Sequence, residues 1–381
     1  MLSFCILCSA AVLAAPAGEG PLVFDRERIG DVVYEAASAC DVDTDGDLDI
    51  VCGGYWFEGP EFKTGHKACD VPANGDYHDD FGDYPMDVNG DGYVDIVTGA
   101  WWGETLQWRE NPKGGPGEWK VHDVAKVGNI ERPSFYDLDG DGHVEVFTTT
   151  SPVHYFRLKR DADGKGAGAF EQYTITDGGG GHGFGCGDIN GDGRPDMVFN
   201  GGWLEAGADP FDVGQWTWHK EFDLGSASVP ILVHDVNGDG ATDLIVGCAH
   251  CYGLFWYEQG KDADGTRTWT KHVIDENNSQ YHDLRLVDID NDDAVELVTG
   301  KRYRAHSGHD PGGDDPLFLC YFEINGGDFE RVMIDYGPPD RASGAGIFFW
   351  VADIDENGWK DIVAPGKEGL YLFRNRGPQK P

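Results

Sequence analysis

Seven short acidic segments recur along this chain, and their regular spacing constrains its fold more than any other feature. Each segment has Asp at its first position, Asp or Asn at its third and fifth, and Asp or Glu at its ninth. The segments begin at Asp41, Asp87, Asp137, Asp188, Asp235, Asp288 and Asp353. Successive starts lie 46, 50, 51, 47, 53 and 65 residues apart. A period of this length indicates an architecture in which each repeat is one small supersecondary unit.

The residues around each acidic segment are typical of short β-strands. Branched apolar residues follow the segments directly, as in DIV from Asp49 and DIV from Asp95, and such residues favour strands. An aromatic strand such as LFWYE from Leu254 comes next, and an outer strand such as WTKHVI from Trp269 follows it. Four short strands per repeat are typical of a β-propeller blade. The sequence therefore predicts an all-β fold, a seven-bladed β-propeller.

The two ends of the repeat array complement each other. The last repeat stops after its third strand, near Asn375, whereas a strand-like segment, PLVFDRERI from Pro21, precedes the first repeat. We expect this N-terminal strand to complete the seventh blade and close the ring, because closure removes an open sheet edge. We therefore interpret residues 20–376 as one propeller domain and residues 377–381 as a short tail.

Alternating oxygen-bearing side chains make each acidic segment a candidate calcium loop. Carboxylate and amide oxygens at positions 1, 3, 5 and 9 suit a hard cation of the size of Ca²⁺. The loops differ from an EF-hand because strands, not helices, flank them. A merely acidic turn is the alternative, but it does not need this alternation in every repeat. We expect several structural Ca²⁺ ions. The expected ligands are Asp41, Asp43, Asp45, Asp49, Asp87, Asn89, Asp91, Asp95, Asp137, Asp139, Asp141, Glu145, Asp188, Asn190, Asp192, Asp196, Asp235, Asn237, Asp239, Asp243, Asp288, Asp290, Asp292, Glu296, Asp353, Asp355, Asn357 and Asp361.

The chain resembles a known repeat family in these loops, of which DVNGDGYVDIV from Asp87 is representative, and in its strand pattern. The resemblance is to the FG-GAP (VCBS-type) repeat propellers, and it covers essentially all of the chain after the N-terminal apolar segment. It implies the propeller fold and calcium binding. It implies little about function, because such propellers serve as adhesion modules, lectins and polysaccharide lyases.

Charge and the N-terminal segment restrict the partners and the location. The formal net charge of −39 repels a polyanion, so nucleic acid is not an expected partner. Residues 1–17 contain an apolar run followed by small residues, and we interpret them as a signal peptide. We expect a secreted or periplasmic protein without a membrane span, because no other apolar run is long enough.

The cysteines do not suggest a disulfide scaffold. The chain has nine Cys, and the odd number cannot form a complete disulfide framework. The segment CAHC from Cys248 has the spacing of half a zinc site, but no second such pair accompanies it. We expect core thiols, and we consider Cys40 with Cys52 as the one candidate bridge.

A second set of equivalent positions points to the central channel. The residues six positions before each first Asp are Glu35, Phe81, Glu131, His182, Val229, His282 and Ile347. They begin the inner strands, which line the channel of a propeller, at the rim opposite the acidic loops. We expect Glu131, His182 and His282 to converge there and to bind a divalent metal or transfer protons. The alternative is a polar, water-filled channel.

Histidines at this channel position, together with YHDLRLVDID from Tyr281, also resemble the propeller of aldos-2-ulose dehydratase. This second resemblance is weaker and covers scattered blades. It implies a sugar dehydratase activity. The additional cupin domains of the fungal enzyme have no counterpart in this sequence, so any isomerase step that they provide is not implied.

The longest interval between repeats contains GKRYRAHSGHDPGGDDP from Gly300. Its basic residues place positive charge where an anionic or enolate group could be held; the alternative is a solvated insertion with internal salt bridges. Aromatic residues at the same rim offer faces that stack on sugars, although such residues also pack between blades. The expected substrate-binding residues are Trp56, Trp101, Trp102, Trp203, His250, Lys301, His306 and His309.

These features favour an exported, calcium-stabilised propeller that acts on or binds carbohydrate at its funnel. If it is an enzyme, we expect a carbon–oxygen lyase, either a sugar dehydratase or a polysaccharide lyase, that works by β-elimination. The expected catalytic residues are His182 or His282 as base, Arg302 and Arg304 beside the enolate, and Tyr303 or Glu131 as proton donor. The rival interpretation is a non-catalytic carbohydrate-binding or adhesion module that contacts other extracellular proteins. The sequence does not decide between the two.

Overall fold

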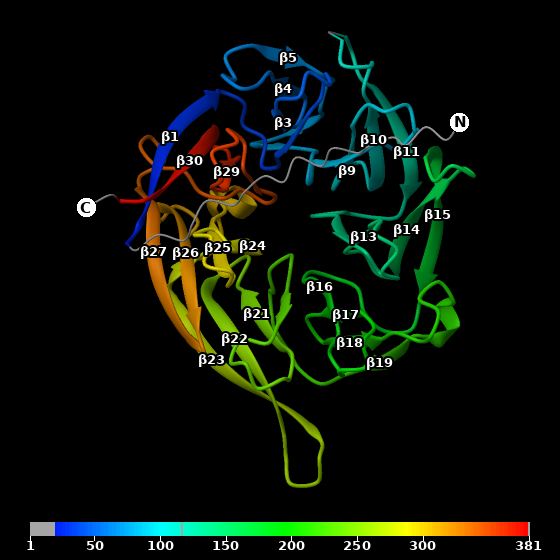
Figure 1. Cartoon of the computed structure of the whole chain (residues 1–381). Helices are drawn as coiled ribbons and strands as arrows, with labels where there is room; N and C mark the ends of the chain where they lie inside the picture. The colour runs from blue at the N-terminus through cyan, green and yellow to red at the C-terminus, as the bar shows by residue number, and fades with distance from the viewer. Residues whose placement is uncertain (1–19, 116, 380–381) are drawn as a thin grey trace, which may run out of the picture.

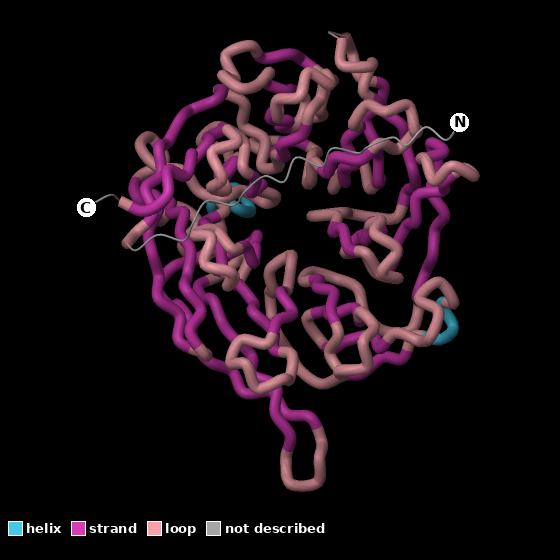
Figure 2. Tube along the Cα trace, viewed as in Figure 1, coloured by secondary structure: helices cyan, strands magenta, loops and turns pink. Residues whose placement is uncertain are grey.

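The structure, a computed structural model, describes residues 20–115 and 117–379 and consists of seven four-stranded antiparallel sheets. The sheets are arranged as blades around a common centre (Figure 1), and strands and loops make up nearly all of the trace (Figure 2). The predicted all-β, seven-bladed propeller is therefore confirmed. The expected signal peptide, residues 1–17, lies outside the described residues.

The first six blades follow one another along the chain, and each runs from an inner to an outer strand. The first three are β2 (Ser38–Cys40), β3 (Asp49–Cys52), β4 (Tyr55–Phe57) and β5 (Gly65–Lys67); β8 (Tyr84–Met86), β9 (Asp95–Gly99), β10 (Thr105–Glu110) and β11 (Lys120–Lys126); and β12 (Ser134–Tyr136), β13 (Glu145–Thr148), β14 (Val153–Arg160) and β15 (Gly166–Ile175). The next three are β16 (Phe184–Gly187), β17 (Asp196–Phe199), β18 (Gly202–Glu205) and β19 (Thr217–His219); β20 (Leu232–His234), β21 (Asp243–Gly247), β22 (Tyr252–Lys261) and β23 (Arg267–Ser279); and β24 (Tyr281–Val287), β25 (Glu296–Lys301), β26 (Leu317–Asn325) and β27 (Asp328–Gly337).

The seventh sheet contains strands from both ends of the described chain. Its three inner strands are β28 (Trp350–Ala352), β29 (Asp361–Ala364) and β30 (Leu370–Pro378), and its outer strand is β1 (Leu22–Gly30). Strands β1 and β30 pair antiparallel, with Phe24 opposite Asn375. Strand β30 therefore reaches into residues 377–381, which were expected to form a tail.

The remaining elements are small. A hairpin of β6 (Ala73–Asn74) and β7 (Tyr77–His78) lies between the first two blades in the chain, and two short 3-10 helices are η1 (Val213–Gln215) and η2 (Ala305–Gly308). No helix in the described ranges is long and apolar enough to cross a membrane.

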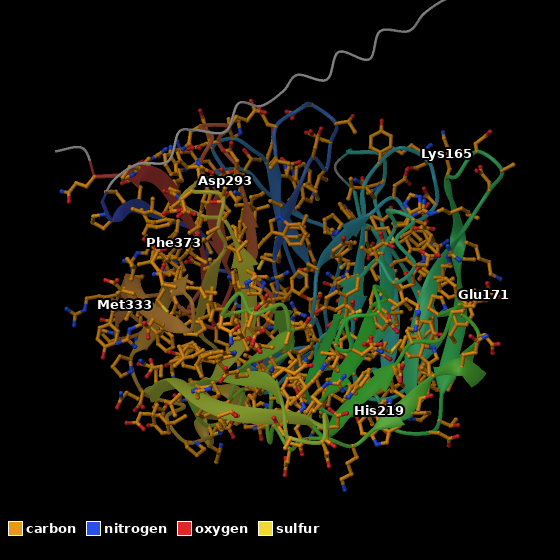
Figure 3. All side chains as sticks on the ribbon, turned by 60° about the horizontal axis from the view of Figure 1, so that its bottom comes forward. Lys165, Glu171, His219, Asp293, Met333 and Phe373 are labelled. Atoms are coloured by element: carbon orange, nitrogen blue, oxygen red, sulfur yellow. A yellow bond between two sulfur atoms is a disulfide. The ribbon has the colours of Figure 1, made fainter. Side chains whose placement is uncertain are left out.

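Apolar clusters between neighbouring blades form the core. In one of them, Phe147 and Tyr155 of the third blade pack with Phe184 of the fourth, and all three are fully buried. Burial of large aromatic rings is a major source of stability in such packing. The outer strands face solvent: Met333 of β27 and Glu171 of β15 lie at opposite outer edges in Figure 3.

Each acidic loop joins the first two strands of its blade and is fastened by its last carboxylate. In all seven loops the ninth side chain accepts the backbone N–H of the second position. In the second blade, Asp95 accepts from Val88 N at 3.0 Å and also from Asn111 N, just after the third strand, at 2.8 Å. The loops therefore lie at one rim, and the starts of the inner strands lie at the other.

Candidate metal centre in the funnel

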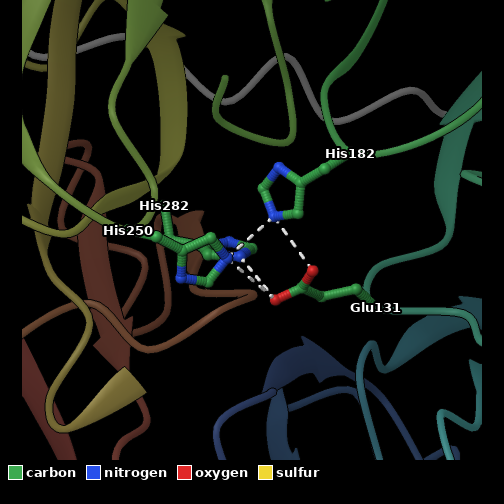
Figure 4. Close-up of side chains that lie close together, drawn as sticks. All are labelled: Glu131, His182, His250 and His282. Atoms are coloured by element: carbon green, nitrogen blue, oxygen red, sulfur yellow. Dashed lines mark hydrogen bonds and ion pairs between the residues drawn. The ribbon is translucent and has the colours of Figure 1, made fainter. Parts of the chain in front are cut away.

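Four side chains from four consecutive blades meet in the channel at the rim opposite the acidic loops (Figure 4). Glu131 precedes β12, His182 precedes β16, His250 lies in the loop between β21 and β22, and His282 lies in β24. Each comes from the start of an inner strand or from the loop after a second strand. Antiparallel pairing brings these two places to the same rim, so residues far apart in sequence converge.

The donor atoms of these four side chains lie within 4.8 Å of one another. His182 Nε2 is 2.9 Å from Glu131 Oε2, and His282 Nε2 is 3.2 Å from Glu131 Oε1. The Nε2 atoms of His182 and His250 are only 3.1 Å apart. We call these four residues the funnel cluster.

The outer nitrogens of two rings determine what their inner nitrogens offer. His182 donates its Nδ1–H to the carbonyl oxygen of Ala227 at 2.6 Å, and His250 donates its Nδ1–H to Asp310 Oδ2 at 2.9 Å. Each neutral imidazole then presents an Nε2 lone pair to the centre. Two lone pairs at 3.1 Å repel each other unless a cation lies between them. This arrangement, with ring N–H groups held by a carbonyl and a carboxylate, is typical of metal-binding histidines.

Burial and neighbouring charge adjust the protonation of the cluster. Burial alone would raise the pKa of Glu131, but the surrounding imidazoles hold it well below its usual range. Burial, together with the positive charge of Arg302, lowers the pKa of His282 well below its usual value. Burial opposes the charged form of His182, but the charge of Glu131 raises its pKa. The cluster therefore offers a carboxylate and a neutral His282 imidazole, and these groups belong to the donor set that Zn²⁺ and similar divalent ions prefer.

Arg302 lies beside the cluster and links Glu131 to Glu35. Its Nε donates to Glu35 Oε1 at 2.9 Å and its Nη1 donates to Glu131 Oε1 at 2.8 Å, and all three side chains are buried. Lys367 Nζ lies 3.7 Å from Glu35 Oε2 and 3.5 Å from the centre of the Tyr77 ring. Because every charge in this network has an opposite partner, the position of Glu131 is fixed.

Two cavities open on either side of the cluster. One, of about 380 Å³, is lined by Tyr77, Phe81, Trp101, Trp102, Glu131, Arg302, His306, Ser307 and His309. The other, of about 300 Å³, is lined by Trp101, Val127, Gly128, Asn129, Glu131, Thr149, Thr150, Ser151, Gly181 and His182. Trp101 and Glu131 line both. One cavity is mainly aromatic and basic, whereas the other offers hydroxyl and amide groups.

A buried carboxylate holds the two tryptophans at the cavity mouth. Asp79 accepts the backbone N–H groups of Trp101 at 2.6 Å, Trp102 at 3.0 Å and Gly103 at 2.7 Å. The Trp101 and Trp102 side chains nevertheless remain 37% and 40% exposed. Large apolar rings on a rigid turn are a preformed surface for stacking.

Asp310 connects the cluster to the insertion after β25. Its Oδ2 accepts from His250, and its Oδ1 lies 2.9 Å from His306 Nδ1. The His306 ring stacks on His250 with centroids 4.3 Å apart. His306 has a positive φ of 48°, as do its neighbours Arg304 at 50° and Ser307 at 57°. Three such residues in one short segment are unusual and mark a backbone held in place by its surroundings.

The structure brings together some of the expected site residues and separates others. Glu131, His182, His282 and Arg302 meet, as the channel argument predicted. Arg304 turns away to Asp314, with Nη1 to Oδ1 at 2.8 Å. Tyr303 is half-buried and is not among the residues that line either cavity.

Three of the expected substrate-binding residues are corrected by their burial. Trp56 is 3% exposed and Trp203 is 1% exposed, because each indole stacks on a histidine of the next outer strand. Lys301 is buried as well, and its ammonium group donates to Ser279 Oγ at 2.7 Å. None of the three can contact a ligand at the surface.

The role of the segment CAHC, which forms a disulfide around a histidine of the funnel cluster, was not predicted from the sequence. Cys248 and Cys251 form a disulfide, whereas Cys40 and Cys52, the pair considered from the sequence, are free and buried. In the register of β2 and β3, Cys40 lies opposite Asp49, so Cys52 is three residues further along. His250, which stands between the bridged cysteines, was expected at the rim and instead completes the cluster.

The acidic loops also present oxygen atoms suited to a cation. In the first loop the ligand atoms of Asp41, Asp43 and Asp45 lie within 4.8 Å of one another, and the third and sixth loops contain similar groups. The buried Asp41 Oδ1 has no hydrogen-bond partner. In the third loop Arg157 Nη2 donates to Asp139 Oδ2 and to Asp141 Oδ2, both at 2.7 Å. The loops therefore fit calcium, and the third carries an internal counter-ion.

Fold and site together define a class of protein: a seven-bladed β-propeller with repeated acidic loops at one rim and one imidazole-rich cluster at the other. Within that class, the chain contains FG-GAP-like repeats, matched at residues 87–148 and 235–299. The resemblance predicted from the sequence is thereby confirmed. No curated protein is significantly similar to this chain in sequence.

The chain is also similar, at low sequence identity, to several solved structures. A lectin from Agrocybe aegerita that recognises non-reducing terminal N-acetylglucosamine is 18% identical, with a TM-score of 0.47, over 82% of this chain and 81% of that chain. The rhamnogalacturonan lyase YesW is 11% identical, with a TM-score of 0.46, over 97% of this chain and 76% of that chain. The V. cholerae biofilm matrix protein Bap1 is 15% identical, with a TM-score of 0.33, over 83% of this chain and 44% of that chain. At this level of similarity, function has to be argued from the site itself.

Proposed function

We propose that this protein is an exported, calcium-stabilised propeller, closed by its N-terminal strand, that binds one divalent transition metal in its funnel and acts there on carbohydrate. The convergence of three imidazole nitrogens and one carboxylate within 4.8 Å supports the metal. His182, His250, His282 and Glu131 would hold it. Bound in this position, a divalent metal ion supplies Lewis-acid stabilisation of an oxygen on the substrate.

The two cavities favour an extended sugar ligand. Trp101 and Trp102 offer flat faces for stacking, and Asn129, Thr149 and Ser151 offer polar groups on the other side of Glu131. A sugar ring has both an apolar face and a ring of hydroxyl groups, so it needs both kinds of contact. Because the cavities meet at Trp101 and Glu131, a chain of at least two sugar rings would pass over the funnel cluster.

The reaction that these residues favour is β-elimination, in revised roles. His182 and His282 direct their Nε2 atoms to Glu131, so neither is free to act as base. His306 lines the larger cavity, and its Nδ1–H is held by Asp310, which leaves Nε2 to accept a proton. Arg302 lines the same cavity and would hold the carboxylate or carbonyl group of the substrate.

In this scheme His306 removes the hydrogen on the carbon next to the carboxylate or carbonyl group. The electron pair of that C–H bond forms the new C=C bond, and the C–O bond to the leaving group breaks. Tyr77 lines the cavity, and burial raises the pKa of its hydroxyl, which therefore stays protonated and can donate to the leaving oxygen. His306 then releases the proton it gained to solvent and Tyr77 takes one up from solvent, so the site is regenerated.

The exposed tryptophans alone favour a second candidate, a non-catalytic carbohydrate-binding module, because stacking needs no chemistry. One experiment separates the two. The protein is incubated with acidic polysaccharides and keto-sugars, and near-ultraviolet absorbance is followed, since elimination creates a conjugated double bond. We expect absorbance with the wild type and with His219→Ala, a histidine on an outer strand, and none with His306→Ala. Binding that Trp101→Ala weakens, without absorbance on any substrate, would identify a binding module.

A further inference from the structure

We infer that the disulfide between Cys248 and Cys251 is a positioning element for the funnel cluster, so that its metal affinity depends on the redox state of the protein. The inference rests on the metal site proposed above. The bridge encloses only Ala249 and His250. A covalent ring of this size leaves the backbone of His250 few conformations, and the ring nitrogen of His250 is one of the four donors.

The bridged loop joins β21 to β22 and is tied to its surroundings on both sides. Cys248 N donates to Gly253 O at 2.8 Å, which closes the hairpin. Ala249 N donates to Ser226 O at 2.9 Å, next to the Ala227 carbonyl that holds His182. The loop therefore sets His250 against the same backbone segment that orients a second donor.

A third donor depends on the other end of the loop. Gln280 N donates to Cys251 O at 3.0 Å, and His282 follows two residues later. Gln280 itself has a positive φ of 63°, so this connection holds a backbone that most residues avoid. Movement of the bridged loop would thus shift the positions of all three histidines.

Outside the funnel cluster, the His250 ring is also held by the insertion that follows β25. Asp310 accepts its Nδ1–H, and His306 stacks on its ring. This insertion has its own positive-φ residues, Arg304, His306 and Ser307, and so relies on contacts made elsewhere. The disulfide is the covalent restraint on His250, and the insertion supplies only non-covalent ones.

The bridge is open to reduction. Cys248 is buried, but Cys251 is partly exposed. A water-soluble phosphine attacks one sulfur, the S–S bond breaks, and water supplies a proton to each thiolate and an oxygen to phosphorus, giving two thiols and a phosphine oxide. The backbone of the loop is then no longer covalently restrained, while the four donor residues are chemically unchanged.

Titration with Co²⁺ tests the inference, because its visible absorption reports the coordination of the ion directly. Oxidised protein is compared with protein reduced by the phosphine and then freed of it, and with Cys248→Ser/Cys251→Ser. We expect the affinity of the reduced protein and of the double variant to fall about 10- to 100-fold, the range found when groups that orient metal ligands are removed. Reoxidation restores the wild-type value, and Cys186→Ser, at a free cysteine elsewhere, leaves it unchanged.

Each outcome has a separate meaning. No Co²⁺ absorption in the oxidised wild type, or the same absorption in His282→Ala, would refute the metal site and with it the proposed function. Equal affinity in oxidised and reduced protein would refute the positioning role alone. A loss of affinity that accompanies a collapse of the melting transition would also overturn it, since the bridge would then hold the blade rather than the ligand.

Discussion

The two rims of this propeller carry two kinds of candidate metal site, and the two kinds are built in opposite ways. At one rim each acidic loop gathers its oxygens within nine consecutive residues, and the pattern recurs in every blade. At the other rim a single cluster takes one side chain from each of four blades. The repeat thus encodes the oxygen sites locally, whereas the nitrogen-rich site is built from the positions where the repeats differ from one another. A repeat can support stability in every blade and still leave one rim free for a unique function.

The largest expected effect concerns the acidic rim as a whole. Removal of calcium with excess EGTA should lower the free energy of unfolding by about 2.7 kcal/mol for each loop that holds its ion at a free concentration 100 times its Kd. With several loops, the melting temperature should fall steeply and should recover on addition of calcium. Differential scanning calorimetry measures this. An unchanged melting curve would mean that the loops are acidic turns without ions.

A substitution in the funnel cluster should affect metal binding there and leave the acidic loops unchanged. His182→Ala removes one of the four donors, so we expect Co²⁺ affinity at the cluster to fall by more than about 100-fold, beyond the effect of losing an orienting group. The response of the melting temperature to calcium should stay as in the wild type, because no acidic loop is touched. If His182→Ala also removed the calcium response, the two rims would not be independent sites.

A third change tests a titrating group that belongs to neither site. Burial raises the pKa of Glu368 to about 7, and its carboxyl group accepts from Gly344 N at 2.7 Å. A raised pKa in the folded state favours the protonated form, so the contribution to stability is complete below the ordinary pKa of Glu and is lost as pH rises through about 7. Glu368→Gln should remove roughly 1–3 kcal/mol of this decline, on the basis of 1.36 kcal/mol per pKa unit. Denaturation at pH 5 and pH 8 checks this, and an equal decline in the variant would exclude Glu368 as its source.

The smallest effect separates one acidic loop from the others. Arg157 pairs with Asp139 and Asp141, which are expected ligands of the third loop. Arg157→Gln should change the stability of the calcium-free protein by less than about 1 kcal/mol, since the pairs are partly exposed. The calcium affinity of that loop should rise a few-fold, because a competing cation is gone. Isothermal titration calorimetry resolves the change, and a weaker third site would show that Arg157 supports the loop.

The fold could be predicted from the sequence because its determinants are local and repeated. The acidic segments, the branched residues after them and the aromatic strands recur in each blade. An error in placing one strand therefore does not change the prediction of a seven-bladed propeller. The meeting of Glu131, His182 and His282 could also be predicted, since it follows from equivalent positions in a ring.

What could not be predicted depended on contacts between strands. Trp56 and Trp203 lie on the third strands of their blades and each stacks on a histidine of an outer strand, whereas the exposed Trp101 lies in the loop between β9 and β10. Lys301 was expected at the surface because of its charge, yet the whole side chain is buried and its ammonium group donates to Gly312 O in the insertion. His250 was one of several rim residues until the disulfide fixed the direction of its ring. The segment CAHC was the available signal for it.

The pairing of β1 with β30 affects the order in which this molecule can be made. One sheet needs residues near both extremes of the described chain, so its contacts have a sequence separation close to the full length. Such long-range contacts slow folding. During synthesis the seventh blade must wait until the last strand has left the ribosome, and the earlier blades spend that interval with an unpartnered flank. The proposed export would benefit from this delay, because a propeller whose ring has not yet closed can still pass through a narrow translocation pore.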